Sequence, residues 1–121
     1  MNKGIITIDN GIISVPTTNE IWMTQHELAD LFQCFVSKIS ANVRSILKNR
    51  LLDENKVCRT YTYKNGNSVE QYNLEMIIAL SFRIRSYNAD LFREFIVRKT
   101  IYNTSTIQIR ICDNWNNIQL N

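Results

Sequence analysis

Short runs of β-branched residues near the start of the chain are separated by a turn signal. Residues 5–8 and 12–15 flank Asp9, Asn10 and Gly11. An Asn-Gly dipeptide between two such runs is typical of a β-hairpin. The pattern therefore predicts a small hairpin over residues 4–15.

The hydrophobic period becomes helical at Thr24. Leu28, Leu31 and Phe32 fall on one helical face. Thr24 is a natural N-cap, and Glu27 three residues later completes a capping box. A helix is therefore expected to begin at Thr24. Trp22, just before it, is expected to be either a core anchor or a hydrophobic staple that packs on the first turn.

A second amphipathic stripe follows, out of phase with the first, which requires a break near residues 33–35. This stripe consists of Ile39, Val43, Ile46 and Leu47. The expected result is two helices joined by a tight turn. Contacts between them would come from Leu28, Ala29, Phe32, Ile39 and Val43, with the small Ala29 at the close crossing.

Residues 58–72 are rich in Tyr, Thr and Val and are divided by Asn65-Gly66. We expect residues 58–64 to pair with 67–72 through a two-residue type I′ turn. Two helices should follow this hairpin. Asn73 would cap the first, whose apolar residues are Leu74, Met76, Ile77, Leu80, Phe82 and Ile84. The second would begin at Asn88 or Asp90, with Leu91, Phe92, Phe95 and Ile96 as its stripe.

The chain of 121 residues has room for one domain, which we place at residues 1–103. A hydrophobic share of 45% with 21% charged residues is typical of a globular protein with a real core. Residues 104–121 are expected to be a polar tail, in which the alternating residues 107–111 indicate either a short strand or a segment that becomes ordered on contact. The longest apolar run, residues 76–80, is far too short to cross a membrane.

The start of the chain lacks the pattern of a signal peptide, which predicts a cytoplasmic protein. Three scattered cysteines, Cys34, Cys58 and Cys112, agree with this expectation because they make a poor disulfide framework. They also lack metal-ligand spacing, and the only histidine, His26, is expected to be an exposed helix residue. Glycines are too few for a phosphate-binding loop. We therefore expect neither enzymatic activity, nor a cofactor, nor a small-molecule substrate.

Helix, tight turn, helix and hairpin, in that order, is the plan of a winged helix-turn-helix, so the predicted fold is α+β of that type. In such a fold the second helix enters the major groove of DNA and the hairpin reaches the flanking backbone. A small α/β protein without a role at DNA would carry the same elements, and this alternative stays open.

The net charge of +3 is small, but the basic residues are clustered along the chain. Lys38, Arg44, Lys48 and Arg50 occur with no acidic residue among them. A second basic set consists of Arg83, Arg85, Arg93, Arg98 and Lys99. Both could contact phosphates or simply form solvated helix faces. Arg83 and Arg85 could also cap the carboxyl end of the helix that precedes them.

The candidate DNA contacts follow from these elements. Base-edge contacts are assigned to Ser37, Lys38, Ala41 and Asn42. Phosphate contacts are assigned to Arg44, Lys48 and Arg50, and to Thr24 and Gln25 at the start of the first helix. The hairpin would contribute Arg59, Lys64, Asn65 and Asn67. Each of these could instead be an ordinary surface residue, and Asn65 could serve only the turn. Tyr61, Tyr63 and Tyr72 could stack on bases or, more commonly, pack across strands.

Several segments together resemble the RhuM family of bacterial virulence-associated and mobile-element proteins, over about residues 1–100. They are Ile21-Trp22-Met23-Thr24-Gln25, Leu28-Ala29-Asp30-Leu31-Phe32, Val57-Cys58-Arg59, Gln71-Tyr72-Asn73-Leu74-Glu75-Met76-Ile77-Ile78, Phe82-Arg83 and Phe92-Arg93. The resemblance implies a bacterial, cytoplasmic protein with a helix-turn-helix that binds DNA, and it brings no catalytic residues.

Two features depart from that family. Its members tend to have glycine, an aliphatic residue and a capping residue at the turn, where this chain has Gln33, Cys34 and Phe35. Phe35 cannot cap a helix, so Ser37 is expected to do so, which shortens the start of the helix by a turn. Phe35 itself could contact a thymine methyl group, a partner protein or the core. After about Lys99 the resemblance fades.

The expected function is therefore binding of duplex DNA, as a transcriptional regulator on a mobile or virulence-associated element. A homodimer is the expected form, because one such module reads only a few base pairs. The alternative is a protein-interaction or oligomerisation module that uses the same scaffold, with Phe35, the last helix and the tail as its surface.

Overall fold

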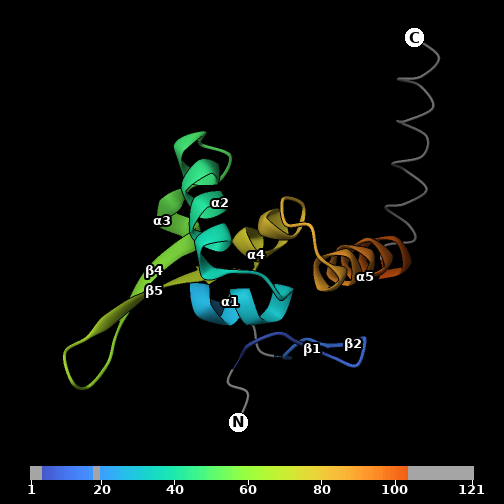
Figure 1. Cartoon of the computed structure of the whole chain (residues 1–121), viewed down its shortest axis with the longest axis horizontal. Helices are drawn as coiled ribbons and strands as arrows, with labels where there is room; N and C mark the ends of the chain where they lie inside the picture. The colour runs from blue at the N-terminus through green and yellow to red at the C-terminus, as the bar shows by residue number, and fades with distance from the viewer. Residues whose placement is uncertain (1–3, 18–19, 104–121) are drawn as a thin grey trace.

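The computed structural model describes residues 4–17 and 20–103 (Figure 1). Its elements, in chain order, are β1 (Thr7–Asp9), β2 (Ile12–Ser14), β3 (Trp22–Thr24), α1 (Gln25–Phe32), α2 (Val36–Lys48), α3 (Glu54–Val57), β4 (Cys58–Thr62), β5 (Ser68–Asn73), α4 (Leu74–Ser81) and α5 (Tyr87–Asn103). The fold is α+β, as expected. The expected strand at 107–111, the tail and Cys112 lie outside the described residues.

The amino-terminal hairpin is confirmed. β1 pairs antiparallel with β2, and Asp9 lies opposite Ile12. Asn10 and Gly11 form the two-residue connection, with φ angles of 51° and 78°. Two consecutive positive φ angles are what a type I′ turn requires, and an Asn-Gly pair adopts them at low cost.

Helix α1 begins where its capping box predicts. The Thr24 hydroxyl accepts from the Glu27 amide at 3.2 Å, and the Glu27 carboxylate accepts from the Thr24 amide at 2.9 Å. The helix ends at Gln33, which has a left-handed φ of 54°. The Cys34 amide then bonds back to the Ala29 carbonyl at 3.0 Å. This turn changes the direction of the chain, and α1 and α2 pack against each other.

The expected cap of α2 is wrong. Ser37 does not cap a delayed start, because the helix already begins at Val36 with Phe35 as its N-cap. The Phe35 backbone is extended, and no side chain caps this helix end. The amides of Lys38 and Ile39 bond to the Phe35 carbonyl instead, at 3.0 and 3.3 Å. Backbone geometry alone therefore starts the helix.

A three-stranded antiparallel sheet in the order β3-β5-β4 lies beside the helices. Strand β3 and the single-turn helix α3 were not predicted from the sequence. Trp22 of β3 pairs with Asn73 of β5 and is only half-buried, so it is a sheet residue and not a core anchor. The alternate position, Met23, faces the core at 1% exposure. Its register partner is Tyr72 of the central strand β5, which is buried as well.

The β4–β5 hairpin forms as expected, but its turn differs from the prediction. Thr62 pairs with Ser68, and the Tyr63 amide bonds to the Asn67 carbonyl. Three residues, 64–66, therefore lie between the bonded pair Tyr63 and Asn67, and Gly66 alone among them has a positive φ, of 93°. The Gly66 amide bonds to the Tyr63 carbonyl at 3.0 Å. This is a type I turn followed by a left-handed glycine, and not a two-residue type I′ turn.

The last two helices follow the sheet. Asn73 caps α4 as predicted, its side-chain oxygen accepting from the Met76 amide at 3.2 Å. The helix ends at Ser81, earlier than expected, which leaves Phe82 60% exposed. Helix α5 begins slightly earlier than expected, at Tyr87, and the Ser86 hydroxyl accepts from the amide of its third residue.

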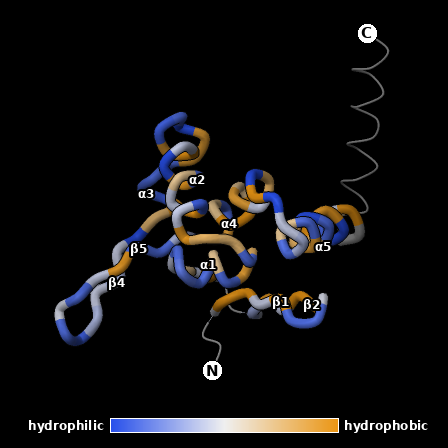
Figure 2. The backbone as a smooth tube through the Cα atoms, in the orientation of Figure 1, coloured by the Kyte–Doolittle hydropathy of each residue, from blue (hydrophilic) through white to orange (hydrophobic). Residues whose placement is uncertain are grey.

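One core joins these elements. It contains Ile6, Ile21, Met23, Leu28, Ala29, Leu31, Phe32, Ile39, Val43, Ile46, Val57, Tyr72, Met76, Ile77, Leu80, Ile84, Ala89 and Phe92. Phe32 of α1 meets Phe92 of α5 edge to face, with ring centroids 5.8 Å apart. The expected contacts between α1 and α2 are all buried. Figure 2 shows that the β4–β5 hairpin extends from this body as an arm with a hydrophilic tip.

No helix in the described ranges is long and apolar enough to cross a membrane.

Candidate nucleic-acid interface

Helix α2 presents a polar, basic stripe on the side opposite the core. Its buried residues are Ile39, Val43 and Ile46. An α-helix turns by about 100° per residue, so the positions directly opposite these three are 37, 41, 44 and 48. We call this the outer stripe of α2; it consists of Ser37, Ala41, Arg44 and Lys48, all exposed. The structure therefore brings four of the predicted contacts into one line.

Two further predicted contacts flank the outer stripe. Lys38 is exposed on one side of it. Asn42 is half-buried, and its amide group donates to the Lys38 carbonyl at 2.9 Å. The Asn42 donor group is therefore engaged within the helix, which leaves Lys38 as the better placed of the two for an external contact.

Arg44 is also held in place. Its guanidinium donates to the Ser40 hydroxyl at 3.1 Å, one turn earlier on the exposed side. This single neutral bond leaves the other donors of the guanidinium directed to solvent. The contact orders the side chain without neutralising its charge.

The positive charge of α2 has no internal counter-charge. No acidic residue occurs between Asp30 and Asp53. Among the described residues the salt bridges join Asp90 to Arg93 and Glu94 to Arg98, both within α5. Lys38, Arg44 and Lys48 take part in neither, so their charge is available to an external anion.

A fourth cation reaches α2 from a distant part of the chain. Arg83, in the loop between α4 and α5, donates to the Ser45 hydroxyl at 3.1 Å. Arg83 directly follows α4 and could cap the carboxyl end of that helix, but the structure places its guanidinium against α2. Residues 38 positions apart carry no local signal of such a contact, so only the fold reveals it.

The two predicted contacts at the start of α1, Thr24 and Gln25, make hydrogen bonds within the protein. The Thr24 hydroxyl is occupied by the capping box. Gln25 donates to the Tyr72 hydroxyl at 3.0 Å, tying α1 to the sheet. Burial raises the pKa of that Tyr72 hydroxyl, while the bond from Gln25 acts in the opposite direction. Tyr72 is therefore a neutral core residue and does not stack on bases.

Arg50 lies just beyond the carboxyl end of α2. It is exposed and has a left-handed φ of 56°. Its amide bonds to the Leu47 carbonyl at 3.1 Å, closing the last turn of the helix. Arg50 therefore extends the basic surface beyond Lys48 at this end.

The hairpin residues divide into two groups. Arg59 lies at the base of the arm, where its guanidinium stacks over the Trp22 ring at 4.4 Å and donates to the Gln71 side chain at 2.8 Å. It lies on the face of the sheet opposite Met23 and Tyr72, since side chains alternate along strands. This is the face turned away from the core.

The other group forms the tip of the arm, where Lys64, Asn65 and Asn67 are all exposed. The Asn65 side-chain oxygen accepts from the Asn67 amide at 2.9 Å, as in an Asx turn. Asn65 therefore serves the turn, and Lys64 supplies the charge of the tip. Figure 1 shows this tip projecting away from α2, so the two basic surfaces are separate.

Two tyrosines accompany Arg59 along the outer side of the arm. Tyr61 and Tyr63 are each 46% exposed and pack edge to face, with ring centroids 5.2 Å apart. They are two residues apart in sequence, Tyr61 within β4 and Tyr63 just after its end, so their rings pack along the chain. Tyr61 also lies opposite Val69 of β5 in the strand register. The exposed faces of both rings remain accessible.

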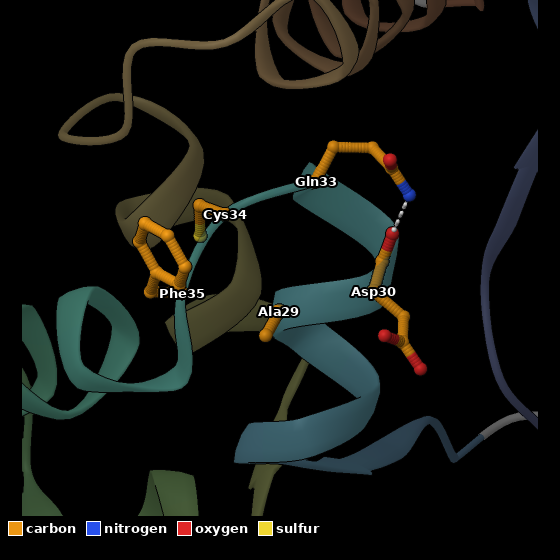
Figure 3. A pocket seen from close by; sticks show the side chains of 5 residues that line it. All are labelled: Ala29, Asp30, Gln33, Cys34 and Phe35. Atoms are coloured by element: carbon orange, nitrogen blue, oxygen red, sulfur yellow. Dashed lines mark hydrogen bonds between the residues drawn. The ribbon is translucent and has the colours of Figure 1, made fainter.

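A shallow pocket of 290 Å³ lies at the turn between α1 and α2 (Figure 3). It is lined by Ala29, Asp30, Gln33, Cys34 and Phe35. The Gln33 side chain folds back onto the Asp30 carbonyl at 2.8 Å. Burial raises the pKa of the Cys34 thiol, and the nearby Lys38 charge offsets this only in part. The thiol is therefore protonated at neutral pH and is not an activated nucleophile.

Within the described residues, no group of three or more histidine, cysteine, aspartate or glutamate side chains is placed to hold a metal ion. His26 is exposed on α1, as expected. Comparison of the chain with known protein families, curated protein sequences and solved structures gave no significant match.

Proposed function

We propose that this protein is a winged helix-turn-helix protein that binds duplex DNA, with α2 in the major groove and the β4–β5 hairpin along the flanking backbone. The observation that carries the proposal is the outer stripe of α2, which is exposed, basic and without a counter-charge. Two features support it: the helices α1 and α2 joined by a tight turn, and the strand order β3-β5-β4 beside them.

The dimensions agree with this mode of binding. An α-helix with its side chains is about 10–12 Å across, and the major groove is about 12 Å wide. Residues at the start of a helix in the groove contact base edges, which assigns Ser37, Lys38 and Ala41 to the bases. Arg44 and Lys48, further along, are assigned to phosphates, with Arg83 joining them from the side.

Binding of this kind releases counterions from the DNA. For each phosphate contact made by a lysine or arginine, the logarithm of the affinity falls with the logarithm of the salt concentration with a slope of about −0.9. A fourfold rise in salt therefore weakens binding about 3.5-fold per contact. Because one such module reads only a few base pairs, we propose a homodimer that reads two half-sites about 34 Å apart. Its role would be that of a bacterial regulator on a mobile or virulence-associated element, as the resemblance to RhuM proteins implies.

A pair of charge-removing variants tests the proposal. Lys38→Ala with Arg44→Ala removes two exposed cations from α2, and alanine favours the helix. The matched control is Arg98→Ala with Lys99→Ala, which lowers the net charge of +3 by the same two units on α5. We expect the first variant to lose more than about tenfold in affinity for duplex DNA and the second to stay close to the parent. Equal affinity of the first variant and the parent would show that α2 is not the reading helix.

One observation favours a second candidate function, a protein-interaction module. Val97 and Ile101 are 47% and 40% exposed one turn apart on α5, and Tyr87 at its start is 73% exposed. Apolar side chains at this spacing form a short stripe suited to a partner helix. A protein that binds no duplex DNA but self-associates, with Val97→Ser and Ile101→Ser abolishing the association, would favour this function.

A further inference from the structure

Phe35 is the most exposed large apolar side chain in the described part of the molecule, at 83%. Exposure of one apolar residue is ordinary by itself, because much of any protein surface is apolar. The position of Phe35 is what distinguishes it. It directly precedes α2, so its ring stands at the helix end that enters the groove in the proposed binding mode.

The residue type at this position is costly for the fold. The N-cap normally carries serine, threonine, aspartate or asparagine, and a capping side chain contributes about 0.5–2 kcal/mol. Helices α1 and α4 both have such caps, from Thr24 and Asn73. Helix α2 has none. A ring at this place therefore does nothing for the helix and, at 83% exposure, little for the core.

The surroundings of the ring favour DNA over a protein partner. Ser37 and Lys38, in the first turn of α2, are both exposed. A hydroxyl, a cation and an apolar ring at one helix end match the major groove, which offers base acceptors, nearby phosphates and one apolar group. That apolar group is the C5-methyl of thymine. Figure 3 shows the Phe35 ring next to Cys34 at the turn, away from the α1 backbone. Its 83% exposure leaves it accessible to such a group.

We propose that Phe35 is a specificity-determining residue that contacts the C5-methyl group of a pyrimidine, which in unmodified DNA is thymine. The inference rests on the proposed DNA binding and adds the base that the helix end selects. Removing one methyl from an apolar contact is expected to lower the affinity about fourfold, from about 0.8 kcal/mol per buried carbon group. The contact involves no charge, so it leaves the salt dependence of binding unchanged.

The test begins with selection of a preferred duplex from random DNA by the parent protein. Each thymine of the selected site is then replaced singly by uracil, which lacks only the methyl group. We expect one position at which the parent loses about fourfold in affinity. Phe35→Ala should bind the thymine and uracil duplexes equally, with the parent's salt slope, because no phosphate contact is lost. A second duplex carries cytosine in place of thymine at that position. Replacing this cytosine by 5-methylcytosine should strengthen binding by the parent protein but not by Phe35→Ala.

Two controls keep the outcomes distinct. Ile12→Ala removes another exposed apolar side chain, 68% exposed on β2, and should keep the thymine preference of the parent. Phe35→Leu keeps an apolar group and should keep part of that preference. If the parent does not distinguish thymine from uracil at any position, or if Phe35→Ala distinguishes them as the parent does, the inference is wrong while DNA binding stands. If no duplex binds at all, both proposals are wrong.

Discussion

The turn that sets α2 against α1 depends on Gln33, and replacing this residue isolates the cost of its backbone conformation. Gln33 has a φ of 54°, in the left-handed region. A residue with a Cβ atom loses roughly 1–2 kcal/mol there relative to its preferred conformation. Glycine avoids this loss, but it increases the conformational entropy of the unfolded chain, which lowers the stability by about 0.4–1 kcal/mol. The protein with Gln33→Gly should therefore be more stable than that with Gln33→Ala by about 0.5–1 kcal/mol.

The comparison of these two variants is clean because both lose the same side-chain bond. In the parent, the Gln33 side chain donates to the Asp30 carbonyl at 2.8 Å in an exposed setting. That bond is worth about 0.5–1.5 kcal/mol, so the parent should lie close to Gln33→Gly. Urea unfolding followed by circular dichroism measures the differences, and an unchanged m-value shows that the unfolded states are comparable. If Gln33→Ala equalled or exceeded Gln33→Gly in stability, the positive φ at the turn would be refuted.

Two further predictions concern residues outside the turn. Asn73→Ala should lower the free energy of unfolding by about 1–2 kcal/mol, because the cap of α4 and the bond from Asn73 to the Lys56 carbonyl are both lost. Asn73→Ser keeps a capping oxygen and should lose less stability in the same urea titration. Equal losses in the two variants would contradict the role of Asn73 as a cap. Burial and the carboxylates of Glu54 and Glu70 raise the pKa of the Cys58 thiol from 9.0 to about 11. Because the folded protein then holds this proton more tightly, the contribution to stability is full below pH 9 and is lost as pH rises through about 11. Alkylation rates in a variant without the other two cysteines should show this midpoint, and a midpoint near 9 would contradict it.

Local signals in the sequence were enough to predict most elements. The capping box at Thr24 and the Asn-Gly turn of the first hairpin specify backbone conformation within a few residues, and both are confirmed. The second Asn-Gly pair shows the limit of such signals. Asn65-Gly66 accepts either turn type, and the pairing of Tyr63 with Asn67 selects the three-residue connection.

Features that depend on contacts distant in sequence could not be predicted. Strand β3 has only three residues, and it exists because it pairs with β5, almost fifty positions later. Arg83 reaches α2 for the same kind of reason. Within α2 the helical period alone gave the outer stripe, since burial of one face determines which residues the opposite face presents.

The central claim is that α2 carries a surface for the phosphates and bases of duplex DNA, and the salt dependence of binding tests it most directly. Fluorescence anisotropy of the purified protein with random duplex DNA would be measured at about 50 mM and about 200 mM salt. Phosphate contacts by Arg44, Lys48 and Arg83 alone predict a slope of about −2.7 and a loss of affinity of about 40-fold over this range. An affinity that stays within about twofold, or no binding at the lower salt, would contradict the account.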